Sequence, residues 1–186
     1  MPSSAYLAGG TGLTVHLLHR VSRDLDFFCE YAEDLEELAQ RLNSSGRVVF
    51  DQRDSSTLTC TFDDTKVQVF NVPRLALLEG TTSTAGLKIA SVRDILAMKL
   101  KALIDRGEMR DYFDLMMIEK QAGLTVEYGL TLAVAKFHPV DQDLFTAQIL
   151  RGLRTTSDVG KDPTLPVTTD EIAQYWERRA RGLPRS

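Results

Sequence analysis

Two blocks near the start of the chain constrain its fold more than any other feature. The first, YLAGG, is a short apolar run that ends in Gly9 and Gly10, which predicts a strand running into a tight turn. The segment TGLTVHLLHR then has leucines at helical spacing, so we expect a short helix, with Thr11 as a candidate N-cap. The second block, DLDFFCEY, is rich in β-favouring residues and predicts a second strand. This order of elements indicates an α/β unit.

The second block contains two aspartates, Asp24 and Asp26, in an otherwise apolar run. Residues two apart on a strand point to the same face, so we expect the two carboxylates side by side, with Leu25 facing the core. Like charges at a partly buried site repel unless one is protonated or a cation lies between them. Hard oxygen ligands with room for water and phosphate oxygens suit Mg²⁺ better than Zn²⁺. A divalent metal ion is therefore the simplest explanation.

The turn formed by Gly9, Gly10 and Thr11 suits a phosphate group. It offers main-chain N–H groups, a hydroxyl and the positive end of a helix dipole. Each motif alone is common, and a plain strand-to-helix turn is the usual explanation of such glycines. The glycine turn and the two aspartates are separated by one short helix, which lets the aspartate strand lie beside the turn. The two motifs together therefore indicate a site for metal and phosphate more specifically than either does alone.

The rest of the first half is predicted as one helix and three strands. The leucines of EDLEELAQRLNSSG define one apolar helical face. The strands are GRVVFDQ, STLTCTFDD and TKVQVFNV, with a hairpin turn at Asp63 and Asp64.

From residue 91 the chain reads as helices. The segment SVRDILAMKLKALIDRG has a capping pattern and a closing glycine, and three further apolar patterns follow up to residue 153. Residues 154–167 are the best candidate for a loop or linker. A last helix is predicted to begin at Thr168, with Glu171 completing a capping box. We therefore predict an α+β fold, with a small mixed sheet flanked by helices in residues 1–90 and a helical half in residues 91–186.

Composition excludes several classes of protein. The chain has 186 residues, is 43% hydrophobic and has a net charge of −4, which argues against a generally basic nucleic-acid-binding surface, although WERRARGLPR is locally basic. Cys29 and Cys60 have no disulfide or metal-type spacing and are expected to be buried thiols. No apolar stretch approaches the ~20 residues of a membrane span and no leader pattern is present, so a cytoplasmic location is expected.

The blocks GGT…HRVSRDLDFF and MKLKALIDRGEMRDYFDL together resemble the AbiEii/AbiGii-type nucleotidyltransferase toxins, which have a DNA polymerase β-like nucleotidyltransferase fold. The resemblance implies a Mg²⁺-dependent enzyme that transfers a nucleotide from an NTP to an acceptor hydroxyl. The implied acceptor is the 3′ end of a tRNA, so translation would be blocked, and the implied partner is a cognate antitoxin. The alternatives are transfer to a protein or small-molecule hydroxyl, and an inactive module that binds a nucleotide or a partner.

The resemblance also implies the site residues. It assigns metal binding to Asp24 and Asp26, charge neutralisation at the triphosphate to Lys99, and binding or deprotonation of the acceptor to Asp114. The nucleotide-binding residues that it implies are Gly9, Gly10, Thr11, Arg20 and Ser22.

Two of these residues have alternative interpretations. Arg20 can form a plain salt bridge with Asp24 instead of touching a phosphate. Asp111 lies three residues before Asp114 on the same helix, and we expect it to pair with Arg106 or Arg110.

The chain departs from the family pattern at two places. Polymerase β-like enzymes usually add a third carboxylate from a neighbouring strand, and the corresponding segment TKVQVF has Lys66 and Gln68 instead. We therefore expect one Mg²⁺ that enters with the nucleotide. Relatives also generally have a helix ahead of the first strand, whereas this chain begins almost at the motif.

Three other side chains have structural explanations. His16 lies among apolar residues and is expected to be structural. Tyr175 and Trp176 are expected in the core of the last helix, with stacking on an unpaired RNA base as the alternative because arginines follow them.

Overall fold

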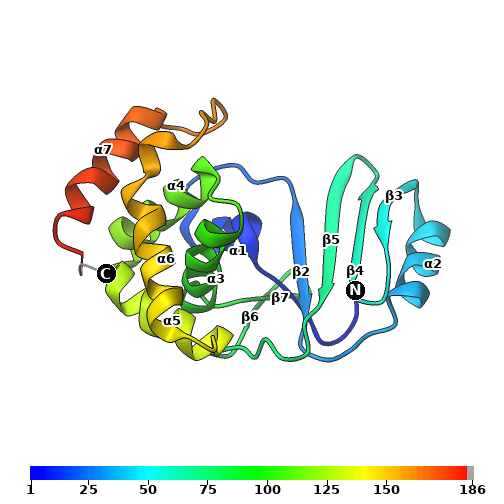
Figure 1. The fold of residues 1–186 in the computed structure, drawn as a ribbon. Helices are drawn as coiled ribbons and strands as arrows, with labels where there is room; N and C mark the ends of the chain where they lie inside the picture. The colour runs from blue at the N-terminus through cyan, green and yellow to red at the C-terminus, as the bar shows by residue number, and fades with distance from the viewer. Residues whose placement is uncertain (184–186) are drawn as a thin grey trace. The chain divides into compact units, whose positions relative to one another are not determined.

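A computed structural model describes residues 1–183, which divide into two compact units (Figure 1). The first unit comprises residues 1–16 and 21–91, and the second comprises residues 17–20 and the chain from residue 92 onward. The first contains a mixed sheet with helices and the second is helical, so the predicted α+β class is confirmed. None of the helices in the described part is long and apolar enough to cross a membrane.

The first unit is built on a sheet that has seven strands within the described residues, in the order β3-β4-β5-β2-β1-β7-β6. Strand β2 is central, antiparallel to β1 and parallel to β5. Strand β7 is parallel to β1, and the remaining neighbours are antiparallel. The strands are β1 (Ala5–Leu7), β2 (Leu25–Cys29), β3 (Val48–Arg53), β4 (Thr57–Phe62), β5 (Thr65–Asn71), β6 (Thr82–Thr84) and β7 (Leu87–Ile89).

The two faces of this sheet differ in chemistry because successive side chains of a strand alternate between them. One face is apolar and packs against helix α2 (Leu35–Ser45), which lies beside β3 and β4 (Figure 1). The opposite face carries Asp26 and Gln68, which are paired in register, and a stack of three aromatic rings. The apolar face is formed by Leu7, Phe27, Cys29, Leu58, Cys60, Val67, Val69 and Ile89.

Local sequence signals explain most of this unit. The carboxylate of Asp34 caps α2 by accepting from the N–H groups of Glu36 and Glu37, both at 3.0 Å. The predicted hairpin turn is confirmed, since Asp63 and Asp64 have φ values of 43° and 69°, typical of the turns that match strand twist. Strands β6 and β7 were not predicted, because three residues each are too few to show a period.

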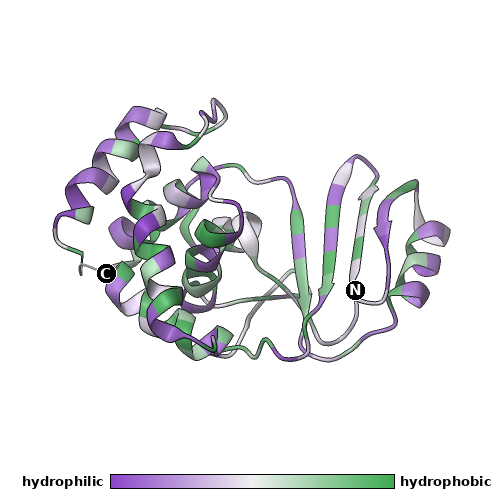
Figure 2. Cartoon of the chain, in the orientation of Figure 1, coloured by the Kyte–Doolittle hydropathy of each residue, from purple (hydrophilic) through white to green (hydrophobic). Residues whose placement is uncertain are grey.

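The second unit packs its helices through the apolar faces that the sequence predicts (Figure 2). Helix α3 contacts α4, α5 and α6, and α7 contacts α4 and α6. A single π-helical turn follows α4 directly. The elements are α3 (Val92–Asp105), α4 (Met109–Met117), the π-helical turn (Ile118–Ala122), α5 (Val126–Phe137), α6 (Gln142–Arg154), a 3₁₀ turn (Thr156–Asp158) and α7 (Thr169–Ala180).

The final helix is attached to α4. Thr168 and Glu171 form the predicted capping box, and the completely buried indole of Trp176 donates its N–H to the carbonyl of Tyr112 at 3.1 Å. Arg179 pairs with Glu119 at 3.0 Å. The RNA-stacking alternative for Trp176 is therefore wrong. Pro184 and Arg185, at the end of the basic segment, lie outside the described residues.

We expect Trp176→Ala to lower the free energy of unfolding by about 3–5 kcal/mol, because it leaves a large cavity between α7 and α4. Urea denaturation measures this change. Val140→Ala is the control, since Val140 is fully exposed, and it should change stability by less than about 0.5 kcal/mol. A Trp176→Ala value as small as the control would contradict the described packing.

Candidate functional site

The glycine turn begins a helix directly. Helix α1 (Gly9–Leu17) starts two residues after β1, so Gly9 and Gly10 lie in its first turn. Gly9 has a φ of 60°, a left-handed conformation open to glycine at little cost. The helix thus begins earlier than the sequence predicts, and Thr11 is its third residue. The prediction of Thr11 as N-cap is wrong.

Thr11 instead ties helix α1 to the segment that precedes β2. Its hydroxyl donates to the main-chain carbonyl of Asp24 at 2.5 Å, and its oxygen lies 2.9 Å from the hydroxyl oxygen of Ser22. Three predicted site residues are therefore brought together by the side chain of one of them. The contact fixes where Asp24 sits relative to the helix.

The two aspartates occupy different positions relative to β2. The strand begins at Leu25, so Asp26 lies within it and Asp24 lies just before it. Strand alternation therefore applies to Asp26, and the side-by-side placement of the two carboxylates stays a prediction. Leu25 packs against the core as predicted, and both aspartates are half-buried.

Asp26 lies directly against the start of helix α1. Its carbonyl accepts from the N–H of Ala8 at 2.9 Å. A Cβ added to Gly9 would lie 2.2 Å from Oδ2 of Asp26, well inside any contact distance. A side chain at position 9 is therefore excluded both by its φ angle and by the carboxylate.

The neighbouring strand places an amide where a third carboxylate is usual. Gln68 on β5 is paired in register with Asp26, and its Nε2 donates to Oγ1 of Thr59 at 3.5 Å. Among residues 1–183, no group of three or more His, Cys, Asp or Glu side chains is arranged to hold a metal ion. Asp24 and Asp26, both half-buried, offer the hard carboxylate oxygens that Mg²⁺ takes together with water and phosphate oxygens.

A cluster of charged side chains occupies the second unit, centred on Asp114 of α4. Oδ1 of Asp114 accepts from Nε2 of His19 at 2.8 Å and from Nε of Arg20 at 2.6 Å. Oδ2 accepts from Nη2 of Arg20 at 2.9 Å and lies 2.6 Å from Nζ of Lys99. The side chains of Asp114 and His19 are completely buried.

Asp111, one turn earlier on α4, extends this cluster. It accepts from Nζ of Lys99 at 2.8 Å and from two nitrogens of Arg106, each at 3.0 Å. The predicted pair of Asp111 with Arg106 is thereby confirmed, whereas Arg110 pairs with Glu108 at 2.5 Å. Sequence reasoning missed that Lys99 joins both aspartates.

Burial and ion pairing act in opposite directions on these groups. Burial alone would raise the pKa of Asp114, but Lys99, Arg20 and His19 outweigh it and hold the pKa well below its usual range. The pKa of Asp111 is likewise lowered, by Lys99 and Arg106 against burial. The pKa of Lys99 is raised, because the two aspartates outweigh its burial. These groups are therefore charged at neutral pH.

Other side chains singled out in the sequence have structural roles. Nε2 of His16 lies 2.8 Å from the carbonyl oxygen of Ala90. Cys29 and Cys60 are buried, and burial, helped by Glu33, raises the pKa of Cys29 to about 11, so it is an inert thiol. His19 was missed as a member of the charged cluster, although the resemblance includes the His19-Arg20 dipeptide.

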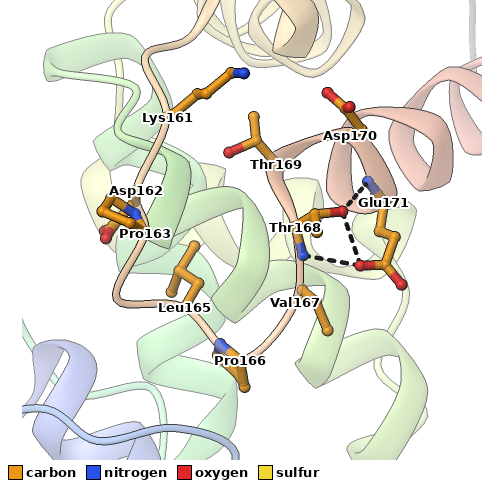
Figure 3. A pocket seen from close by; sticks show the side chains of 10 residues that line it. All are labelled: Lys161, Asp162, Pro163, Leu165, Pro166, Val167, Thr168, Thr169, Asp170 and Glu171. Carbon is orange, nitrogen blue, oxygen red and sulfur yellow. Dashed lines mark hydrogen bonds between the residues drawn. The ribbon is translucent and has the colours of Figure 1, made fainter.

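A cavity of about 470 Å³ lies inside the loop that precedes α7 (Figure 3). None of the predicted site residues lines it. Its charged residues are Lys161 and three carboxylates, and Thr168 and Glu171 are bonded to each other there. This acidic loop does not suit phosphate groups.

A family profile and a known protein each match nearly the whole chain. The family profile described as "Nucleotidyl transferase AbiEii toxin, Type IV TA system" matches residues 2–76 and 67–186. An uncharacterized protein of Aquifex aeolicus is 27% identical over 180 residues, which cover 95% of this chain and 86% of that protein.

Two solved structures share the fold. JHP933 from Helicobacter pylori has a TM-score of 0.57 and 23% identity, covering 96% of this chain and 82% of that one. MenT4, a nucleotidyltransferase toxin from Mycobacterium tuberculosis, has a TM-score of 0.57 and 17% identity, covering 97% of this chain and 76% of that one.

We expect Gly9→Ala to destabilise the protein more than Gly86→Ala. Both glycines have a positive φ, 60° and 78°, so both variants bear the backbone strain of about 1 kcal/mol. Only at Gly9 does the new methyl group meet Asp26, which adds about 1–3 kcal/mol, whereas nothing lies within 4 Å of the Cβ position at Gly86. Chemical denaturation of both variants measures the difference, and equal losses would contradict the close contact.

Proposed function

The chain belongs to the AbiEii family of nucleotidyltransferase toxins of type IV toxin–antitoxin systems, and on this premise we propose that it transfers a nucleotide from an NTP to the 3′ end of a tRNA. Such a transfer would take place in the cytoplasm and would block translation. The family implies an NTP substrate and an antitoxin as a partner. The observation that carries the proposal is the close approach of the Asp26 carboxylate to the first turn of α1.

This contact supports a combined site for metal and phosphate. The first N–H groups of a helix have no partners within the helix and attract anions, while a carboxylate repels them unless a cation balances its charge. A metal ion between Asp26 and a phosphate group held by the start of α1 would therefore favour the approach of the two. An NTP that carries Mg²⁺ meets both requirements.

The proposed reaction is an in-line displacement at the α-phosphorus. The oxygen of the acceptor hydroxyl forms a new bond to the α-phosphorus, the bond from that phosphorus to the bridging oxygen of the β-phosphate breaks, and pyrophosphate leaves. The hydroxyl proton passes to a base or to water. Mg²⁺ would supply charge neutralisation at the phosphates.

The roles of the residues follow the family pattern and the contacts. Asp24 and Asp26 hold the metal ion, and Gly9 and Gly10 leave the start of α1 open to a phosphate. Thr11 and Ser22 fix the segment before β2 through their hydroxyl contact. In the same proposal, Arg20 contacts a phosphate and Lys99 neutralises charge at the triphosphate.

The first test is transfer of label from each NTP in turn, labelled at the α-phosphate, to total tRNA in the presence of Mg²⁺. We expect one NTP to label tRNA, and we expect Asp24→Asn and Asp26→Asn each to reduce the rate by about a thousandfold, since metal-bound charge stabilisation is worth several kcal/mol. Asp64→Asn is the control, because Asp64 is exposed and pairs only with the exposed Arg47 among the contacts described.

Two results would contradict the proposal. Full activity of an Asp24→Asn, Asp26→Asn double variant would exclude these carboxylates from catalysis. Absence of label in tRNA, with label entering a protein or small molecule instead, would reject the tRNA acceptor and favour the alternative acceptor.

Gln68 offers a second, independent test of the metal site. Because Gln68 lies in register with Asp26, Gln68→Glu should add a third carboxylate and raise Mn²⁺ binding from about one to about two ions per chain. Titration followed by electron paramagnetic resonance measures the stoichiometry. Gln52→Glu, on the far strand β3, should leave it unchanged. A stoichiometry of about two already in the wild-type protein would reject the single-ion site.

A further inference from the structure

Asp114 lacks the properties of a general base. A base needs a lone pair directed at the proton that it takes and a pKa near the working pH. Oδ1 of Asp114 accepts from His19 and Arg20, and Oδ2 accepts from Arg20 and pairs with Lys99. The side chain is completely buried. Its carboxylate is therefore committed to bonds within the protein.

The same carboxylate holds a strained segment. Leu18 has a φ of 50°, unusual for a leucine, and the residue is 84% exposed. The two residues that follow it, His19 and Arg20, are both bound to Asp114. Strained backbone persists only where the surroundings over-determine it, and here the two side-chain contacts do so.

His19 is placed to orient the carboxylate. Its ring stacks on Phe113, with centroids 5.8 Å apart and an interplanar angle of 20°, and it approaches Asp114 through Nε2. Its buried Nδ1 has no hydrogen-bond partner within the described part of the chain. The ring thus makes one directed polar contact, and that contact is with Asp114.

We propose that Asp114 and His19 are positioning residues, which hold Arg20 and the segment Leu17–Arg20 in the conformation that binds the triphosphate. This rests on the proposed function, because Arg20 contacts the NTP in it. Asp114 acts through Arg20, and His19 acts through Asp114, while Lys99 lies against both aspartates and balances their charge.

Asp111 provides a matched control for Asp114. The two side chains lie on the same helix, both are completely buried and both bind Lys99. Asp111 pairs with Arg106, whereas Asp114 pairs with Arg20 and His19. Asp111→Asn and Asp114→Asn are isosteric changes, so only the second should release residues 18–20.

The first measurement is hydrogen exchange of the amides of residues 18–20 without nucleotide. We expect Asp114→Asn and His19→Phe to speed this exchange about 10-fold, since each removes a buried polar contact. Asp111→Asn should leave exchange at the wild-type rate. His19→Gln, unlike His19→Phe, should also exchange at the wild-type rate, because the side-chain amide of Gln keeps a hydrogen-bond donor where Nε2 of His19 lies. Unchanged exchange in both Asp114→Asn and His19→Phe would overturn the proposal.

The second measurement separates positioning from proton transfer. We expect Asp114→Asn to raise KM for the NTP about 10-fold or more and to leave the shape of the pH–rate profile unchanged. An unchanged KM with a fall in kcat and loss of the acidic limb would identify Asp114 as the base and overturn the proposal. If the wild-type protein transfers no nucleotide to any acceptor, the proposed function fails, and the exchange experiment still decides whether Asp114 and His19 hold the segment.

Discussion

The first unit depends on the contact between the Asp26 carboxylate and the main chain at Gly9. That contact requires a residue with no Cβ and a positive φ, and it joins the end of β1, the start of α1 and the central strand β2. The same constraint brings a carboxylate to helix N–H groups that attract phosphate. A structural requirement and the proposed chemistry therefore coincide at one pair of residues.

The second unit is organised around buried charge. Asp111 and Asp114 lie on a helix whose other inward residues are apolar, and an unpaired buried carboxylate costs several kcal/mol. Lys99, Arg106 and Arg20 balance the two charges, so the loss of one partner exposes the others to that penalty. The arrangement explains why the segment RDYFDL keeps two aspartates three residues apart, and it ties residues 17–20 to α4 through His19 and Arg20.

Much of the fold follows from patterns in the sequence. The leucines of α2, the capping box of Thr168 and the turn at Asp63 and Asp64 are local signals, and the structure confirms each of them. The start of α1 was misplaced because the left-handed Gly9 begins the helix earlier than Thr11, the residue that capping preference indicates. Strands β6 and β7 carry no pattern of sufficient length.

The candidate site was less accessible to sequence reasoning. The residue types of the site could be recognised in the sequence, because two carboxylates in an apolar run and a glycine turn predict binding of a metal ion and a phosphate. Three contacts of the site join residues that are distant in the chain. They are the pairing of Gln68 with Asp26, the hydrogen bond from Thr11 to the carbonyl of Asp24, and the contacts of Asp114 with His19 and Arg20. Spacing along the sequence does not predict such long-range contacts, so the proposed positioning role of His19 could be inferred only from the structure.

Transfer of a nucleotide with release of pyrophosphate sends the α-phosphate and the γ-phosphate of the NTP to different products, so the two can be followed separately. Parallel reactions with tRNA and Mg²⁺ would use NTP labelled at the α-phosphate or at the γ-phosphate. We expect the α-label to enter the acceptor and the γ-label to be recovered entirely as pyrophosphate. Recovery of the γ-label in the acceptor would show phosphoryl transfer instead and would exclude nucleotidyl transfer.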